Sequence, residues 1–258
     1  MDSDIDMKID LSGKTALVTG GARDIGRATA LALVESGAAV AINYYASGDR
    51  ADALVSEITA KGGRAIAVQG DVTKALHVER IIADTTKAFG GKIDILVNNA
   101  GGLLARKTVA EMDETFFDDV MALNFKSVFL VTKAVTQVMP EGGAIVNLAS
   151  LAARDGGGPG SAIYAAAKGA VLTFTRGMSK ELAGKRIRVN CVSPGMIATT
   201  FHDTFTKPEA RKATAARTSV GREGTSEDVA NAIVFLVSNA SAYLNGESIE
   251  INGGLYFV

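Results

Sequence analysis

The stretch Thr15–Glu35 reads TALVTGGARDIGRATALALVE and contains the three parts of a strand-turn-helix unit. Its apolar start, Thr15–Thr19, predicts a β-strand, and its end, Arg27–Glu35, predicts an amphipathic helix. The glycines between them allow a sharp turn and a close approach of the backbone to a ligand, and the helix start offers free amides and a positive dipole end. The turn alone fits a tight structural connection and a phosphate-binding loop equally well.

The same alternation of short apolar runs and longer helical segments continues along the chain. The predicted strands are Thr15–Thr19, Ala39–Tyr44, Ala65–Gln69, Ile93–Val97, Ala144–Ala149, Arg188–Val192 and Ser248–Ile251. The helical segments include Arg27–Glu35, Arg50–Ala60, Leu76–Phe89, Glu114–Val138 and Glu227–Val237. Apolar strands joined by helical crossovers predict a parallel sheet covered on both faces. We therefore expect an α/β fold with about seven parallel strands in a single doubly wound (Rossmann) domain over residues 11–258, after a tail at 1–10.

Composition narrows the possible classes of protein. Of the 258 residues, 47% are hydrophobic and 21% are charged, which is typical of a folded domain with a sizeable core. The net charge is −1 with no basic block, so a nucleic-acid partner is not expected. Cys191 is the only cysteine, which excludes an internal disulfide and favours a reducing compartment. Neither a signal peptide nor an apolar run of ~20 residues is visible, so we expect a cytoplasmic protein with no membrane partner.

The end of the second predicted strand bears on the choice of nucleotide. Ligands of open α/β sheets bind outside the carboxyl ends of the strands, and an NAD site there usually offers a carboxylate to the ribose. Here the strand ends Asn43-Tyr44-Tyr45-Ala46-Ser47, without a carboxylate. Arg23 in the glycine turn could bind a 2′-phosphate, and Ser47 could assist; an exposed loop arginine is the competing interpretation. We predict NADP(H), with NAD(H) as the alternative.

Two further strand ends carry candidate cofactor residues. After the third strand, Asp71 could accept a hydrogen bond from an adenine amino group and Val72 could pack on the ring, although helix capping explains Asp71 equally well. After the fourth strand, Asn98 begins the run NNAG, in which paired amides can tie neighbouring strands together. The small Ala100 and Gly101 leave room for a cofactor, and ordinary turn chemistry is the alternative.

Tyr164 and Lys168 lie in the alanine-rich run SAIYAAAKGA, residues 161–170. The two residues are four positions apart, and this spacing places both side chains on one face of a helix. A nearby ammonium lowers the pKa of a phenol, which is ordinarily about 10, and such a pair can exchange a proton with a substrate oxygen. An isolated pair of this kind is more often simple packing, so the rest of the chain has to decide.

Taken together, the motifs resemble those of the short-chain dehydrogenase/reductase family. The resemblance runs from about Asp10 to the C-terminus. The motifs that carry it are TGxxx(G)xG at Thr19–Gly26, NNAG at Asn98–Gly101, Leu123-Asn124-Phe125, the strand-end serine in Val146–Ser150, YxxxK at Tyr164–Lys168, and Pro194–Thr199. The C-terminal segments Ser241–Gly246 and Ile251–Val258 look most like the bacterial 3-oxoacyl-acyl-carrier-protein reductase branch.

The resemblance implies a catalytic set of four residues. Tyr164 would be the general acid in carbonyl reduction and the general base in alcohol oxidation. Ser150 would hydrogen-bond the substrate oxygen. Lys168 would hold the nicotinamide ribose and lower the pKa of the tyrosine, and Asn124 would position a water that relays protons to solvent.

The same resemblance implies the cofactor contacts, and no metal. Ile197 and Thr199 would hold the nicotinamide carboxamide. The full set of predicted cofactor residues is Gly20, Arg23, Asp24, Ile25, Tyr44, Tyr45, Ser47, Asp71, Val72, Asn98, Ala100, Gly101, Tyr164, Lys168, Pro194, Gly195, Ile197 and Thr199.

Asp24 departs from the family pattern, because it stands where the middle glycine of the motif is usual. A carboxylate repels a pyrophosphate. Asp nevertheless tolerates unusual backbone angles and can cap a helix, so we expect Asp24 to cap the helix that it begins, with cofactor bound through neighbouring amides.

A second departure concerns the substrate. The stretch before the fifth strand, Thr136–Gly143, lacks the basic residues on which an acidic carrier protein would dock, although Lys185 and Arg186 could form half of such a patch. The substrate-side segment is expected at 199–217, with Phe201–Arg217 as its variable part. Its cations, Lys207, Arg211, Lys212 and Arg217, could favour an acidic substrate, but a solvated helix face is the better interpretation; His202 is too isolated to be assigned a catalytic role.

These features predict an NADP(H)-dependent oxidoreductase that interconverts a carbonyl and a secondary alcohol. A 3-oxoacyl-acyl-carrier-protein reductase is one option, and a reductase of a free small ketone, sugar or hydroxy acid is another. A sugar epimerase or dehydratase is disfavoured because the chain stops just after its last predicted strand. A non-catalytic NADP-sensing protein is disfavoured because all four catalytic candidates are present. The family also implies a homotetramer, in which the apolar tail Leu255–Val258 would be buried.

Overall fold

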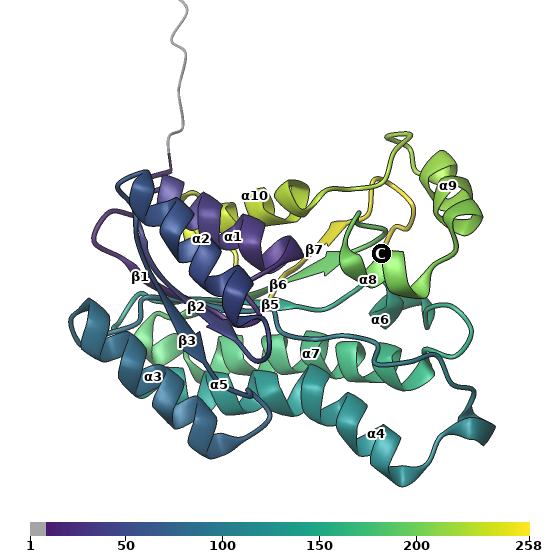
Figure 1. The fold of residues 1–258 in the computed structure, drawn as a ribbon, viewed down its shortest axis with the longest axis horizontal. Coiled ribbons are helices and arrows are strands. Elements are labelled where there is room, and N and C mark those ends of the chain that lie inside the picture. The colour runs from purple at the N-terminus through teal and green to yellow at the C-terminus, as the bar shows by residue number, and fades with distance from the viewer. Residues whose placement is uncertain (1–8) are drawn as a thin grey trace, which may run out of the picture.

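In the computed structural model, which describes residues 9–258, seven strands form one sheet in the order β3-β2-β1-β4-β5-β6-β7 (Figure 1). Every pairing between neighbouring strands is parallel. The strands are β1 (Thr15–Val18), β2 (Ala39–Tyr44), β3 (Arg64–Gln69), β4 (Ile95–Asn98), β5 (Ala144–Leu148), β6 (Arg188–Pro194) and β7 (Ser248–Ile251). The expected doubly wound parallel sheet is confirmed.

Helices cover both faces of the sheet (Figure 1). On one face lie α1 (Asp24–Glu35), α2 (Gly48–Ala60) and α10 (Ser226–Val237). On the other face lie α3 (Ala75–Phe89), α4 (Glu114–Met121), α5 (Ser127–Val135) and α7 (Ala162–Glu181). The shorter helices α6 (Ala152–Asp155) and α8 (Thr200–Phe205), together with α9 (Pro208–Arg217), lie beyond the carboxyl ends of β5, β6 and β7. Single 3₁₀ turns occupy Val109–Glu111, Ala183–Lys185 and Asn239–Ser241.

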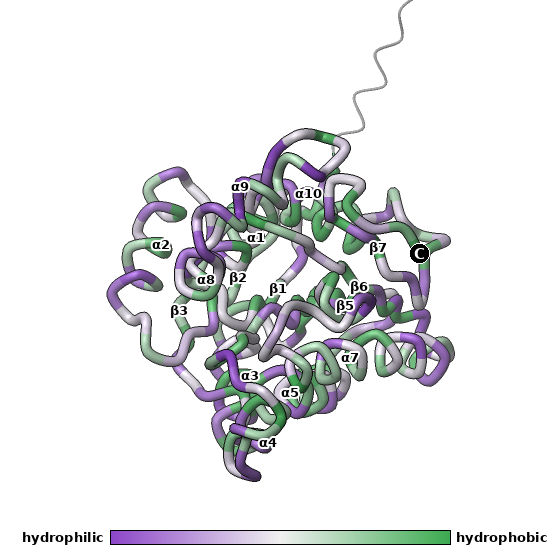
Figure 2. The backbone as a smooth tube through the Cα atoms, turned by 90° about the vertical axis from the view of Figure 1, so that its right-hand side faces the viewer, coloured by the Kyte–Doolittle hydropathy of each residue, from purple (hydrophilic) through white to green (hydrophobic). Residues whose placement is uncertain are grey.

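The core has two main layers, one on each side of the sheet. Successive side chains of a strand point to opposite faces, so on β1 Leu17 packs into the layer under α3 and α5, while Val18 packs into the layer under α1 and α10. In Figure 2, which colours the backbone by hydropathy, the inner strands are largely hydrophobic, and the outer turns of α2 and α9 are largely hydrophilic. Each fully buried aliphatic side chain contributes roughly 1.5–3 kcal/mol to folding. Within residues 9–258, no helix combines the length and apolarity that crossing a membrane requires.

The long helix expected over Glu114–Val138 is not continuous. It divides into α4 and α5, which are joined by a π-helical turn at Ala122–Lys126. Asn124, inside this turn, donates a side-chain hydrogen bond of 2.9 Å to the carbonyl of Val120. Single π turns inside α-helices frequently occur at functional sites, and this one turns Asn124 toward the loop after β4.

The topology places a crevice beside β1. The chain moves outward from β1 to β3 and then returns to β4, on the other side of β1. In open α/β sheets the carboxyl ends at such a switch point form the ligand crevice. The glycine turn after β1 and the NNAG run after β4 therefore lie next to each other.

Candidate active site

Lys168 connects helix α7 to the end of β5. Its side chain is only 3% exposed, and its Nζ donates a 2.8 Å hydrogen bond to the carbonyl of Leu148, the last residue of β5. One helical turn earlier lies Tyr164, and Ser150, which follows the same strand, is close enough for its side chain to act on the pKa of the tyrosine. The structure thus brings three of the four predicted catalytic residues together.

The fourth, Asn124, joins them through the loop after β4. Its Oδ1 accepts a hydrogen bond from the amide of Gly102 at 2.9 Å, and its Nδ2 donates to the carbonyl of the same residue at 2.8 Å. A Cβ atom placed on Gly101 would lie 2.9 Å from both Asn124 Oδ1 and Lys168 Nζ. An added carbon would displace one of these two side-chain ends, so Gly101 permits their convergence.

The pKa of Tyr164 is shifted in the direction opposite to the one expected from its neighbour Lys168. Burial raises the pKa of Tyr164, and the hydrogen bond from Ser150, which acts in the opposite direction, is the smaller effect. Lys168 Nζ lies 5.9 Å from the centre of the tyrosine ring, and burial lowers its own pKa to about 8. The expected lowering of the tyrosine pKa by the lysine is therefore not found here. Burial disfavours the charged phenolate, and this effect outweighs the Ser150 hydrogen bond that favours it.

The glycine turn is tightly packed against the loop after β4. Asn99 Nδ2 donates to the carbonyls of Thr19 and Gly20, at 2.9 and 3.0 Å. A Cβ atom on Gly26 would lie 2.3 Å from the Gly20 carbonyl oxygen, so only glycine fits there. Gly20 itself has φ 60°, in the left-handed region that favours glycine.

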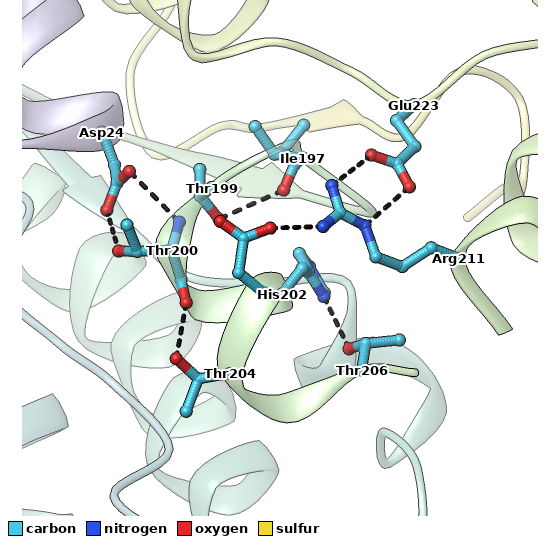
Figure 3. Close-up of polar contacts among 10 residues, drawn as sticks. Asp24, Ile197, Thr199, Thr200, His202, Thr204, Thr206, Arg211 and Glu223 are labelled. Carbon is cyan, nitrogen blue, oxygen red and sulfur yellow. Dashed lines mark hydrogen bonds and ion pairs between the residues drawn. The ribbon is translucent and has the colours of Figure 1, made fainter. Parts of the chain in front are cut away.

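Asp24 begins α1 but does not cap it. Within residues 9–258, α1 has no side-chain hydrogen bond at its N-cap residue, Arg23. Instead, the Asp24 carboxylate accepts hydrogen bonds from the backbone amide and the hydroxyl of Thr200, the first residue of α8 (Figure 3). The expectation that Asp24 caps its own helix was wrong, because its carboxylate is bonded to Thr200 across the crevice. The backbone of Asp24 is in the left-handed region, with φ 49°.

The expected 2′-phosphate region is rich in arginine. Two adjoining hollows, of about 330 and 390 Å³, lie between α1 and the start of α2, and Arg23 and Arg50 line both. Ser47 lines the second, and Arg27, which pairs with Glu57, lines the first. Sequence reasoning missed Arg27 and Arg50; the position of Arg50 in the first turn of the helix after β2 could have indicated it. Asp49 also lines the second hollow, and Tyr45 at the end of β2 is 69% exposed.

Asp71 does not cap α3, whose N-cap residue is Lys74, whereas Asn98 has the strand-tying role that its motif predicts. The Asp71 carboxylate accepts hydrogen bonds from the amide and the hydroxyl of Thr73, so it closes the turn before α3, while Val72 beside it is buried. Asn98 Nδ2 donates to Asn147 Oδ1 on β5 at 2.8 Å, which ties the two strands as predicted.

The remaining predicted cofactor residues surround the crevice. Ile25 is partly buried at the start of α1, and Ala100 packs beside β4. Pro194 ends β6, and the amide of Gly195 donates to the carbonyl of Ile251 on β7 at 2.9 Å. Ile197 and Thr199 follow and are buried, and the Thr199 hydroxyl donates to the Ile197 carbonyl at 3.1 Å.

Helix α8 places aromatic side chains over Tyr164. The Phe201 ring packs on the Tyr164 ring with centroids 5.9 Å apart, and Phe205 packs on Phe201 at 5.3 Å. His202 hydrogen-bonds Thr206 at 2.9 Å, and burial lowers its pKa (Figure 3).

The cations of the substrate-side segment are not gathered into an anion site. Lys207, Lys212 and Arg217 are exposed, and Arg211 bonds Glu223 and Asp203 (Figure 3). The interpretation of a solvated helix face therefore holds for Lys207, Lys212 and Arg217, whereas Arg211 is held by two carboxylates.

Comparison with known proteins agrees with this geometry. Residues 20–256 match the family model described as enoyl-(acyl carrier protein) reductase. The 3-oxoacyl-[acyl-carrier-protein] reductase of Staphylococcus aureus (strain Mu50) is 40% identical over 245 residues, covering 94% of this chain and 98% of the relative. A dehydrogenase/reductase from Sinorhizobium meliloti 1021 superposes with a TM-score of 0.92 at 36% identity, over 97% and 98% of the two chains. A blue fluorescent protein from a metagenomic library, solved in complex with NADPH, has a TM-score of 0.90 at 34% identity, over 96% and 100%. The chain belongs to the short-chain dehydrogenase/reductase family.

Proposed function

We propose that this protein is an NADP(H)-dependent reductase that interconverts a carbonyl and a secondary alcohol, with Tyr164 as its proton donor. The observation that carries the proposal is the joining of Tyr164, Ser150 and Lys168 at the end of β5, beside the glycine turn. A proton donor, a hydroxyl and a cation next to a dinucleotide crevice are what carbonyl reduction requires.

The chain's own residues fit a dinucleotide phosphate. Gly26 lets the turn fold tightly onto Gly20 at the start of α1. The N-cap residue of α1, Arg23, makes no side-chain cap hydrogen bond in the part of the chain that the structure describes. The hollows lined by Arg23 and Arg50 suit a 2′-phosphate, and a relative of the same fold was solved with NADPH. Lys168 would hold the ribose, and Ile197 and Thr199 the carboxamide. When bound, the nucleotide supplies or accepts the hydride.

The protein's residues supply the proton and orient the carbonyl. The raised pKa keeps Tyr164 protonated at neutral pH, so its phenol can donate to the substrate oxygen. The Ser150 hydroxyl donates a hydrogen bond to the same oxygen and stabilises the negative charge that develops there. Lys168, with a pKa of about 8, can release and regain a proton near physiological pH, and Asn124 beside it directs the route toward solvent. In the oxidative direction Tyr164 takes the proton back.

The substrate proposed first is a 3-oxoacyl thioester carried by an acyl carrier protein. The S. aureus relative, which this chain matches over 98% of its length, is named for that activity. In this chain, Phe201 and Phe205 offer an apolar surface for an acyl chain beside Tyr164.

A specific observation favours a second candidate, the reduction of a free small ketone. The two cations that could dock an acidic carrier are already engaged: Arg186 pairs with Glu141 at 2.6 Å, and Lys185 Nζ donates to the carbonyl of Thr136 at 3.2 Å. The experiment is to follow NADPH oxidation at 340 nm with a 3-oxoacyl carrier protein, the same acyl group on a short thioester, and a panel of ketones. A kcat/KM at least tenfold higher for the carrier-bound form supports the first candidate, and equal values support the second. No turnover with any of them, while Tyr164→Phe binds NADPH normally, would contradict reductase activity.

We further propose a cytoplasmic homotetramer. Strand β7 lies at the edge of the sheet, and Phe257 and Val258 beyond it are 80% and 79% exposed, in agreement with a covered surface in an assembly. A monomer by light scattering at micromolar concentration would contradict the tetramer.

A further inference from the structure

Asp24 links two parts of the site that lie 176 residues apart in the chain. The backbone amide of Thr200 donates to Asp24 Oδ1 at 3.2 Å, and the Thr200 hydroxyl donates to Asp24 Oδ2 at 2.5 Å (Figure 3). Arg23 Nη1 donates to the same hydroxyl oxygen at 3.0 Å, and Arg23 Nε lies 3.9 Å from Asp24 Oδ2. The glycine turn therefore binds the first residue of α8 through charge-assisted hydrogen bonds, which are stronger than neutral ones.

This link forms although the backbone of Asp24 is unfavourable. A φ of 49° lies in the left-handed region, which a residue with a side chain adopts at a cost that glycine does not bear. Glycine would accept this conformation freely but would offer no carboxylate to α8. The side chain has a structural consequence, because it joins α1 to α8.

Helix α8 carries the aromatic ring that covers the catalytic tyrosine. Phe201, the residue after Thr200, packs on Tyr164 with an interplanar angle of 38°. At the other end of α8, Arg106 from the loop after β4 donates to the carbonyls of Phe205 and Pro159, at 3.1 and 2.9 Å. The helix is thus fastened at both ends, and the tie at its start comes from the turn that would receive the nucleotide phosphates.

We propose that Asp24 is a positioning residue that latches α8 to the glycine turn and so sets the position of Phe201 over Tyr164. The latch makes the width of the substrate entrance depend on the nucleotide turn, and its effect on substrate rests on the reductase function proposed above. Asp24→Gly removes both hydrogen bonds to Thr200, and Thr200→Val removes the one from its hydroxyl, so each variant weakens the latch at the start of α8.

The first experiment uses the nucleotide-free protein and needs no turnover. Amide hydrogen exchange is measured over residues 200–206 in wild type, Asp24→Gly, Thr200→Val, Thr200→Ser and Thr204→Val. Thr200→Ser keeps the hydroxyl and is the rescue variant. Thr204→Val is the matched control, because it removes a threonine hydroxyl from the same helix whose hydrogen bond is to the Thr200 carbonyl, within α8. We expect at least tenfold faster exchange in Asp24→Gly and Thr200→Val, and wild-type exchange in the two others.

The second experiment separates substrate binding from chemistry. In Asp24→Gly and Thr200→Val, the substrate KM should rise about fivefold or more with kcat within twofold, while the NADPH Kd from calorimetry stays within tenfold of wild type. The double variant should resemble Asp24→Gly, because that single variant already removes both hydrogen bonds to Thr200.

Three results would overturn the proposal. The first is unchanged exchange in Asp24→Gly, and the second is equal loosening in Thr204→Val, which would indicate general fraying of α8. The third is a KM that does not move when exchange does, which would leave Asp24 without a positioning role. If no substrate turns over at all, the exchange measurement still tests the latch, so failure of the proposed function is distinguishable from failure of the latch.

Discussion

The Nζ atom of Lys168 lies 2.8 Å from the carbonyl oxygen of Leu148, and this contact fixes helix α7 against the end of β5. Because Ser150 follows Leu148 by two residues and Tyr164 precedes Lys168 by one turn, this hydrogen bond helps to align Tyr164 with Ser150. The same burial that secures the lysine also disfavours its charge.

The pH dependence of reduction should report this burial. The pKa of Lys168 is lowered to about 8, so its ammonium is present below that pH and is lost as the pH rises through it. We expect kcat/KM for carbonyl reduction to be level below pH 8 and to decline above it. A profile that stays level to pH 9.5 would contradict a role for the protonated lysine.

Replacing Lys168 with methionine should separate function from stability. The lowered pKa, from 10.5 to about 8, corresponds to roughly 3 kcal/mol against the buried charged form. Lys168→Met should therefore lose at least 100-fold in kcat/KM, while its thermal midpoint stays the same or rises. The measurements are turnover at 340 nm and differential scanning calorimetry; a midpoint lowered by more than 5 °C would show that the ammonium stabilises the fold.

Removing the phenol should abolish proton donation and leave binding intact. A positioned general acid contributes typically 10²–10⁴-fold, so Tyr164→Phe should lower kcat by about that factor. Its ring still packs on Phe201, so the NADPH Kd should stay within threefold. A kcat within tenfold of wild type would exclude Tyr164 as the proton donor.

The arginines around the two hollows should set the nucleotide preference. Arg23→Ala and Arg50→Ala should each lower kcat/KM with NADPH about tenfold or more and change kcat/KM with NADH little, because NADH has no 2′-phosphate. Exposed Lys212, on α9 and away from these hollows, offers the control Lys212→Ala, which should behave as wild type with both. A wild-type preference for NADH would contradict the NADP(H) proposal.

The glycine turn should not tolerate even one added carbon at Gly26. A Cβ atom there would lie 2.3 Å from the Gly20 carbonyl oxygen and 2.9 Å from Gly21 Cα, so backbone must move. We expect Gly26→Ala to cost roughly 1–3 kcal/mol in the free energy of unfolding and to raise the NADPH Kd at least tenfold. Gly184→Ala is the control, since among the described residues nothing lies within 4 Å of its added carbon. Equal stability of both variants in urea unfolding would show that the turn has room for a carbon at Gly26 and is less tightly packed than these distances indicate.

The sequence predicted those features that depend only on residues close together in the chain, namely the strands, the helices and the spacing of Tyr164 and Lys168. Apolar runs and helical periodicity placed the seven strands, because a strand or an amphipathic helix is specified by the residues within it. The spacing of Tyr164 and Lys168 placed them on one face for the same reason. The break at Asn124 was not visible, since the π turn depends on hydrogen bonds to Gly102 in a different loop.

Tertiary structure decided the electrostatics and the long-range contacts. The sequence by itself indicated a tyrosine-lysine pair, a glycine turn and an unusual Asp24. Only the folded chain determines that burial raises the pKa of Tyr164, because desolvation depends on every element packed around the phenol. Likewise, Asp24 bonds Thr200 rather than its own helix, because the fold brings α8 to the carboxyl edge of the sheet, where a partner from the far end of the chain meets the glycine turn.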